Sequence, residues 1–131
     1  MAHRLLILTS VLLAAPASAA RAQSSPDTLP PGVTPAMIEQ GRKLFGGAGL
    51  CLACHGPDGK GSVGPDLTDT VWVHHRGGYE EIVAQVARGI PAEESKSGVV
   101  MPPRGGSSLK DDEIRAVSAY VWSLSRRRAV P

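Results

Sequence analysis

Residues 51–61, CLACHGPDGKG, contain both cysteines of the chain: two residues separate Cys51 from Cys54, and His55 follows directly. Such a group can form a disulfide redox centre, part of a zinc site, or the attachment point of a covalently bound haem. Each of these chemistries needs different residues around the cysteines. The rest of the sequence can therefore distinguish between them.

Three of the possible chemistries lack supporting residues. A structural disulfide would close a very short loop and remove little entropy from the unfolded chain. A thioredoxin-like centre needs a βαβ surround, and the sequence has no alternating strand pattern. A zinc site would need His74 or His75 as its fourth ligand, without a second cysteine pair to support it. We therefore favour haem, for which C-x-x-C-H is the attachment signature.

Under this interpretation the spacing has a physical reason. The thiols of Cys51 and Cys54 lie one helical turn apart and can form thioethers with the two vinyl groups on one haem edge. His55 then reaches the iron as the proximal ligand. A low-spin iron takes a sixth ligand, and Met101 is the best candidate because it lies in a polar loop rich in glycine and proline. The proline that follows favours extended backbone at Met101.

Other side chains are weaker candidates for the sixth ligand. Met37 falls on the apolar face of an expected helix, where a methionine usually fills the core. His74 and His75 follow Trp72 in an apparent loop, and exposed histidines usually titrate in solvent without a function. The two histidines remain the alternatives to Met101.

The first 22 residues have the pattern of a secretory signal peptide. Arg4 supplies the positive charge, an apolar run of 11 residues follows at Leu5–Ala15, and small residues come next. A membrane-spanning helix needs about 20 apolar residues, so we expect removal of this segment and no stable membrane span. Cleavage after Ala19 or after Ala22 would satisfy the small-residue rule.

Removing residues 1–22 from the 131-residue chain leaves 109 residues, enough for one domain. The loss of Arg4 and Arg21 takes the formal net charge from +2 to 0. Three of the remaining arginines are consecutive at 126–128, so the domain before them is mildly acidic. This charge distribution does not fit a nucleic-acid-binding protein. The arginines are expected to form a solvated tail or to meet an acidic partner.

Helical periodicity divides the rest of the chain. Thr34 is a good N-cap, Pro35 suits the first helical position, and apolar residues then recur at helical spacing. The expected helices are 35–46, 79–88 and 111–125, and the expected loops are 56–69 and 91–108. We expect a mobile linker at 23–33, a single domain at 34–125 and a basic tail at 126–131. The predicted fold class is all-α with long loops.

At this point the sequence resembles a known family, the bacterial class I (monohaem) cytochromes c. It is similar to the small periplasmic ones and to the haem c domains of oxidases and dehydrogenases. The resemblance covers residues 34–125. It is carried, in the family's order, by GRKLFGGAGLCLACHG (41–56), GSVGPDLTD (61–69), ARGIP (87–91), VVMPPRGG (99–106) and LKDDEIRAVSAYVWSL (109–124). It implies a small cytochrome c fold, with three to five helices and long loops wrapped around one covalently attached haem.

The resemblance also implies roles for residues of the haem pocket. The carbonyl of Pro65 would accept a hydrogen bond from Nδ1 of His55, which fixes the ring. Leu67 would line the pocket. Trp72 would donate its indole N–H to a haem propionate, although packing alone can also explain a tryptophan at this position.

In this family the first and last helices cross at small and aromatic residues. The corresponding residues here are Gly41 and Phe45 on the first helix and Val117 and Tyr120 on the last. One departure from the family pattern is Lys110, which stands where Ser or Thr usually caps the last helix. Loss of such a cap costs about 1 kcal/mol, unless Ser107 or Ser108 replaces it.

The expected function is single-electron transfer between ferrous and ferric iron by a periplasmic carrier, with no separate catalytic machinery. The carrier would exchange electrons with redox proteins such as a dehydrogenase, a cytochrome complex or a terminal oxidase. One alternative is a haem c electron-accepting subunit of a periplasmic dehydrogenase or oxidase complex. Another is a haem enzyme or gas sensor with a labile sixth ligand.

Without haem, the protein is predicted to be largely unfolded. If haem hides about 400 Å² of apolar surface, the gain is on the order of 10 kcal/mol as an upper estimate. That is comparable with the whole stability of a typical domain, about 5 to 15 kcal/mol. A Cys51→Ala/Cys54→Ala variant purified without haem should show no cooperative transition in a circular dichroism melt. A cooperative, native-like melt would contradict this expectation.

Overall fold

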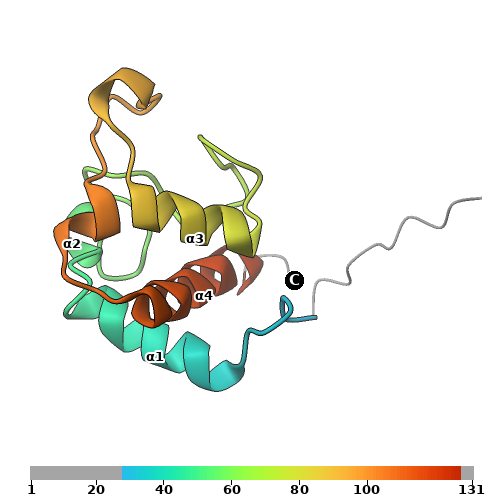
Figure 1. The fold of residues 1–131 in the computed structure, drawn as a ribbon. Helices are drawn as coiled ribbons and strands as arrows, with labels where there is room; N and C mark the ends of the chain where they lie inside the picture. Colours follow the sequence, from blue (N-terminus) through green and yellow to red (C-terminus); the bar gives the residue numbers. More distant parts are fainter. Residues whose placement is uncertain (1–27, 128–131) are drawn as a thin grey trace, which may run out of the picture.

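The computed structural model describes residues 28–127, and it is all-α there, as predicted. Its elements are α1 (Pro35–Gly46), α2 (Leu52–His55), α3 (Tyr79–Arg88), the 3-10 helices η1 (Ala92–Glu94) and η2 (Pro103–Gly106), and α4 (Asp111–Arg127) (Figure 1). Within the described residues, the only β pairing is an isolated antiparallel bridge between Ile90 and Met101. The signal peptide predicted at 1–22 lies outside the described residues.

Local sequence signals explain where the helices begin. The Thr34 side chain accepts a hydrogen bond from the N–H of Met37 at 3.2 Å, and Pro35 occupies the first helical position of α1. At α3 the carboxylate of Glu81 reaches back to accept the N–H of Gly78 at 2.9 Å. The bounds predicted for α1 and α3 are therefore confirmed.

Two predicted boundaries differ from the structure. The linker predicted at 23–33 is too long, because Val33 is buried and Leu29 packs against the core. Helix α4 continues to Arg127 and does not end at residue 125. The guanidinium of Arg126 lies 5.2 Å from the centroid of the Trp122 ring, so this arginine belongs to the folded domain and not to a tail.

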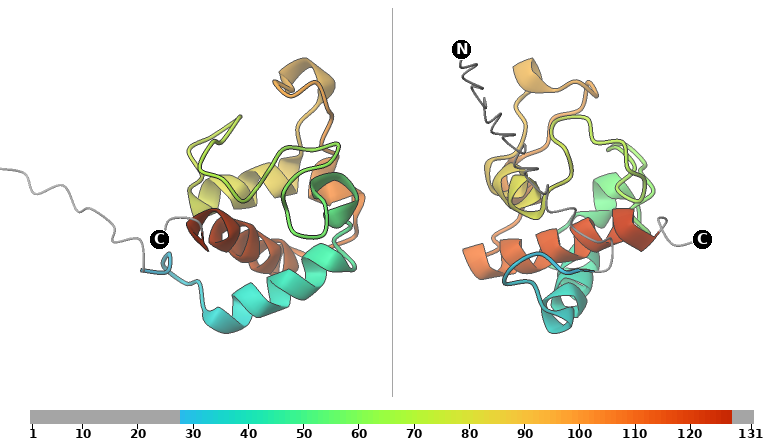
Figure 2. Two further views of the ribbon diagram at one scale, coloured as in Figure 1. Left: turned by 180° about the vertical axis from the view of Figure 1, so that it is seen from behind. Right: turned by 90° about the vertical axis from the view of Figure 1, so that its right-hand side faces the viewer.

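Helix α4 lies between α1 and α3 and runs across both, as the views from the front, back and side agree (Figures 1 and 2). A Cβ at Gly41 would collide with the carbonyl of Ala116, so only glycine permits this approach of α1 to α4. Beside it, the rings of Phe45 and Tyr120 pack edge to face, with centroids 5.4 Å apart. The predicted crossing of the first and last helices is therefore present, with Ala116 as an additional contact.

The start of α4 is held without the serine cap that we considered. The carboxylate of Glu113 accepts the N–H of Lys110 at 2.8 Å, which supplies half of a capping box. Ser107 accepts the N–H of Leu109, before the helix. The guanidinium of Arg104 bonds the Leu109 carbonyl and lies 2.7 Å from a carboxylate oxygen of Asp111. An acidic residue and an arginine thus secure this helix end.

The long loops lie on the side of the domain away from α1. One loop runs from α2 to α3 and the other from α3 to α4. Residues 91–100 of the second loop, called the excursion below, project from the body of the domain (Figure 1). The buried core is formed mainly by apolar residues of α3 and α4, together with Phe45 of α1. The two loops, α2, and the faces of α3 and α4 turned toward them enclose the cavity described next.

Candidate haem site

The cavity, together with the solvent at its open mouth, encloses about 1050 Å³. Its walls are mostly apolar. They come from α2, the loop that follows it, α3, α4, and the segment around Met101. All seven residues predicted for the cofactor site line this one cavity: Cys51, Cys54, His55, Pro65, Leu67, Trp72 and Met101.

Helix α2 is a single turn that sets the geometry of the C-x-x-C-H motif. The N–H of His55 donates to the carbonyl of Cys51 at 2.9 Å, so Cys51, Cys54 and His55 are held within one turn. The chain reaches this turn through Leu50, whose left-handed backbone conformation (φ 58°) is costly for a residue with a side chain. The sharp reversal brings α2 to the cavity directly after α1.

The surroundings of the cysteines argue against a zinc site. Both are free thiols, with Cys51 half-buried and Cys54 exposed. Burial raises the pKa of the Cys51 thiol to about 11. Within residues 28–127, no group of three His, Cys, Asp or Glu side chains could hold a metal ion.

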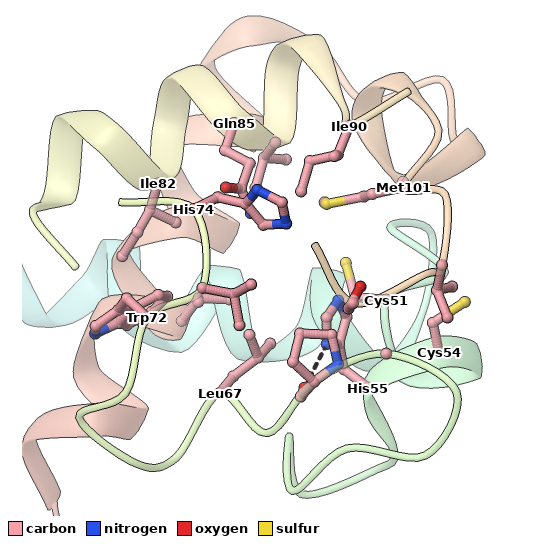
Figure 3. A pocket seen from close by; sticks show the side chains of 18 of the residues that line it. Cys51, Cys54, His55, Leu67, Trp72, His74, Ile82, Gln85, Ile90 and Met101 are labelled. Atoms are coloured by element: carbon pink, nitrogen blue, oxygen red, sulfur yellow. Dashed lines mark hydrogen bonds between the residues drawn. The ribbon is translucent and has the colours of Figure 1, made fainter. Parts of the chain in front are cut away.

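His55 is oriented by the hydrogen bond that the sequence predicts. Its Nδ1 lies 2.9 Å from the carbonyl oxygen of Pro65 (Figure 3). A carbonyl can only accept, so Nδ1 carries the proton and Nε2 keeps its lone pair. Burial lowers the pKa of His55 against a smaller opposing effect of the Pro65 carbonyl, and the ring therefore stays neutral. Gly64 permits this arrangement, because a Cβ there would press against the His55 ring.

The segment around Met101 is held by backbone hydrogen bonds that the sequence did not predict. Met101 and Ile90 exchange two backbone hydrogen bonds, of 2.7 and 3.0 Å, in the antiparallel bridge. The preceding Gly89 has a positive φ of 73°, and a Cβ there would collide with the Met101 carbonyl. Thus fixed, the thioether of Met101 points into the cavity from the side opposite His55 (Figure 3).

Trp72 closes the end of the cavity away from Met101 (Figure 3). Its indole stacks on the ring of His75, with centroids 4.8 Å apart and planes 29° apart. A Cβ at Gly77 would collide with the Trp72 indole, so the glycine allows the chain to pass close to it. Leu67 projects into the cavity from the loop after α2.

His74 and His75 take different places in the structure. His75 also lines the cavity, and its Nδ1 accepts the N–H of Gly77 at 2.9 Å. His74 instead turns its ring into the cavity, between Gln85 and Met101 (Figure 3). His74 lies in a loop, as expected, but it is half-buried and not exposed, so that part of our interpretation was wrong. Nothing in the local sequence pattern indicates the direction of its ring.

Together these features fit haem and define a c-type cytochrome domain. Two thiols stand on one turn at the edge of a large apolar cavity, and an oriented imidazole and a thioether enter it from opposite sides. The comparison with known families gives the same result. The model of the family described as cytochrome c oxidase, cbb3-type, subunit III matches residues 36–121. The chain belongs to this family.

Curated relatives are similar along the same region. The cbb3-type cytochrome c oxidase subunit CcoP of Rubrivivax gelatinosus is 37% identical over 86 residues, which are 62% of this chain and 25% of the relative. The subunit FixPc of Rhizobium leguminosarum bv. viciae is 34% identical over 93 residues, which are 69% of this chain and 29% of the relative. The chain thus spans less than a third of the length of these relatives.

A solved structure supports the fold. Cytochrome CL of the marine methylotrophic bacterium Methylophaga aminisulfidivorans MPT superimposes with a TM-score of 0.55 at 26% identity, over 70% of this chain and 55% of that one. The fold is therefore that of a small cytochrome c. The chain is a haem c electron-transfer domain, and its haem c is covalently bound. No helix within residues 28–127 is long and apolar enough to cross a membrane.

The pinning of Met101 by Gly89 can be tested. In Gly89→Ala the new methyl group would displace the Met101 carbonyl and with it the sulfur. We expect the far-red charge-transfer band of thioether-ligated ferric iron to weaken or disappear. Gly98→Ala is the matched control, because Gly98 has a similar positive φ but no atom within 4 Å of the added Cβ. Equal spectra for the two variants would show that Gly89 does not position the sulfur.

Proposed function

We propose that this chain is the haem c electron-transfer component of an exported terminal oxidase complex. The observation that carries the proposal is the pair of donors, His55 and Met101, which enter the cavity from opposite sides. The chain that holds them belongs to a family of oxidase subunits. The bound group supplies a single-electron couple between ferrous and ferric iron. The residues of the chain hold that group and control access to it.

Each site residue has a defined part in this proposal. Cys51 and Cys54 would form the two thioethers that fix the haem edge. His55 would bind the iron through Nε2 while its Nδ1–H stays on the Pro65 carbonyl, which keeps the ring in one orientation. Met101 would bind the iron as a second protein ligand, and a thioether favours the reduced iron and so raises the potential. With both residues bound, the site would favour electron transfer over reaction with small molecules.

The comparisons favour an oxidase component over the diffusible carrier that the sequence first suggested. The curated relatives cited are oxidase subunits, and the chain matches one part of their length. Electron exchange requires the haem edge to approach a partner. Three exposed apolar side chains that also line the cavity mark the surface for this approach: Leu50 (53% exposed), Val71 (73%) and Val100 (51%). Export to the periplasm is part of the proposal and rests on the N-terminal pattern.

Replacing the proposed sixth ligand should change the redox couple. Met101→Ala should lower the midpoint potential by on the order of 0.1 V and abolish the far-red thioether band, because loss of the sulfur removes its preference for ferrous iron. Met37→Ala is the control, because Met37 packs on the core from α1 and is not part of the cavity wall. Spectroelectrochemical titration measures both variants. An unchanged potential in Met101→Ala would exclude Met101 as the ligand.

The partner can be tested with a purified cbb3-type oxidase. The reduced holoprotein should be oxidised in the presence of catalytic amounts of the oxidase and oxygen, and it should co-elute with the oxidase in size-exclusion chromatography. Oxidation without co-elution would favour the diffusible carrier over the oxidase component. Failure of both would contradict an oxidase as partner and direct the search to dehydrogenases.

A further inference from the structure

The proposed function leaves the placement of the His74 imidazole in the cavity unexplained. Its Nε2 is buried and makes no hydrogen bond, and within residues 28–127 only the hydroxyl of Ser118 shares this condition. A buried polar atom without a partner is destabilising, so such an atom calls for an explanation. The explanation must lie in what fills the cavity.

The direction of the His74 ring restricts what its Nε2 can bind in the cavity. It enters the cavity from the same side as the Met101 thioether, and both face the side from which His55 enters (Figure 3). A nitrogen donor and a sulfur donor therefore converge on the position opposite His55. Neutral imidazole is a good ligand for haem iron, and its unused Nε2 is the donor atom.

The backbone around His74 is not paired with other backbone, unlike that around Met101. Within the described chain, residues 69–77 make no backbone to backbone hydrogen bond. The segment is held by side-chain contacts: Asp69 accepts the N–H of Val71, Glu81 accepts the N–H of Arg76, and the ring of His75 stacks on Trp72. A segment without backbone pairing opens locally more easily than a paired one, so we expect His74 to reach the position that Met101 occupies when the sulfur leaves it.

We propose that His74 is a reserve sixth ligand, which binds the iron whenever Met101 leaves it. The inference rests on the proposed ligation by His55 and Met101. In the exchange, the bond from iron to the Met101 sulfur breaks and a bond from iron to Nε2 of neutral His74 forms. Each ligand keeps its own electron pair, and no electron or proton is transferred. The exchange would keep the iron six-coordinate and closed to small molecules.

His75 provides a matched control in the adjacent position. Its ring stacks on Trp72, and its Nδ1 accepts the N–H of Gly77. Because its ring and its Nδ1 already have these partners, we expect that His75 does not replace Met101. The two histidines thus differ in direction and not in residue type.

The test compares three haem-loaded variants at pH 8: Met101→Ala, Met101→Ala/His74→Phe and Met101→Ala/His75→Phe. Met101→Ala and Met101→Ala/His75→Phe should give low-spin spectra without the thioether band. Met101→Ala/His74→Phe should be high-spin. Ferrous carbon monoxide binding should be about tenfold tighter or more in Met101→Ala/His74→Phe than in Met101→Ala, because an internal ligand bound most of the time reduces apparent affinity by that fraction.

Added imidazole should restore the low-spin spectrum of the His74→Phe double variant, which would show that its cavity is intact. Met101→Ala/His74→Leu repeats the test if the phenylalanine disturbs folding. A high-spin spectrum of Met101→Ala alone would overturn the proposal. So would a low-spin spectrum that survives loss of His74. The wild-type spectrum is read separately: absence of its thioether band would refute Met101 ligation, whatever His74 does.

Discussion

The close crossing of α1 and α4 is the constraint on which the rest of the structure depends. Gly41 lets the two backbones meet at Ala116, and the edge-to-face pair of Phe45 and Tyr120 fills the space beside this contact. Only four residues separate α1 from the C-x-x-C-H motif. The crossing therefore determines where that motif stands against the wall of the cavity. The position of the haem attachment motif thus depends on the packing of these two helices.

The sequence predicted what depends on local chemistry. Caps and periodicity placed α1 and α3 correctly, and the cysteine spacing identified the haem. It did not predict features that depend on contacts between distant segments. The bridge of Ile90 with Met101 leaves no period in the sequence, and the side of the chain that His74 faces depends on how a loop crosses the cavity. At Lys110, where Ser or Thr was expected to cap α4, the carboxylate of Glu113 accepts the Lys110 N–H instead.

The two sides of the haem site are built with different stiffness. On one side, the imidazole of His55 is tied to the Pro65 carbonyl and packed against Gly64. On the other, the bridge holds the backbone of Met101, while the segment that carries His74 lacks backbone pairing. A rigid proximal side keeps the iron in one environment during electron transfer. Any change of ligand is thereby confined to the distal side.

The bridge between Ile90 and Met101 also separates two tasks within one loop. It closes the excursion at 91–100 at its base, so the positions of Met101 and its sulfur do not depend on the length or composition of the excursion. Ser97, Val99 and Val100 of the excursion line the cavity, and Val100 is exposed. This part of the surface can therefore diverge between related proteins, and partner choice can evolve there without retuning the redox centre.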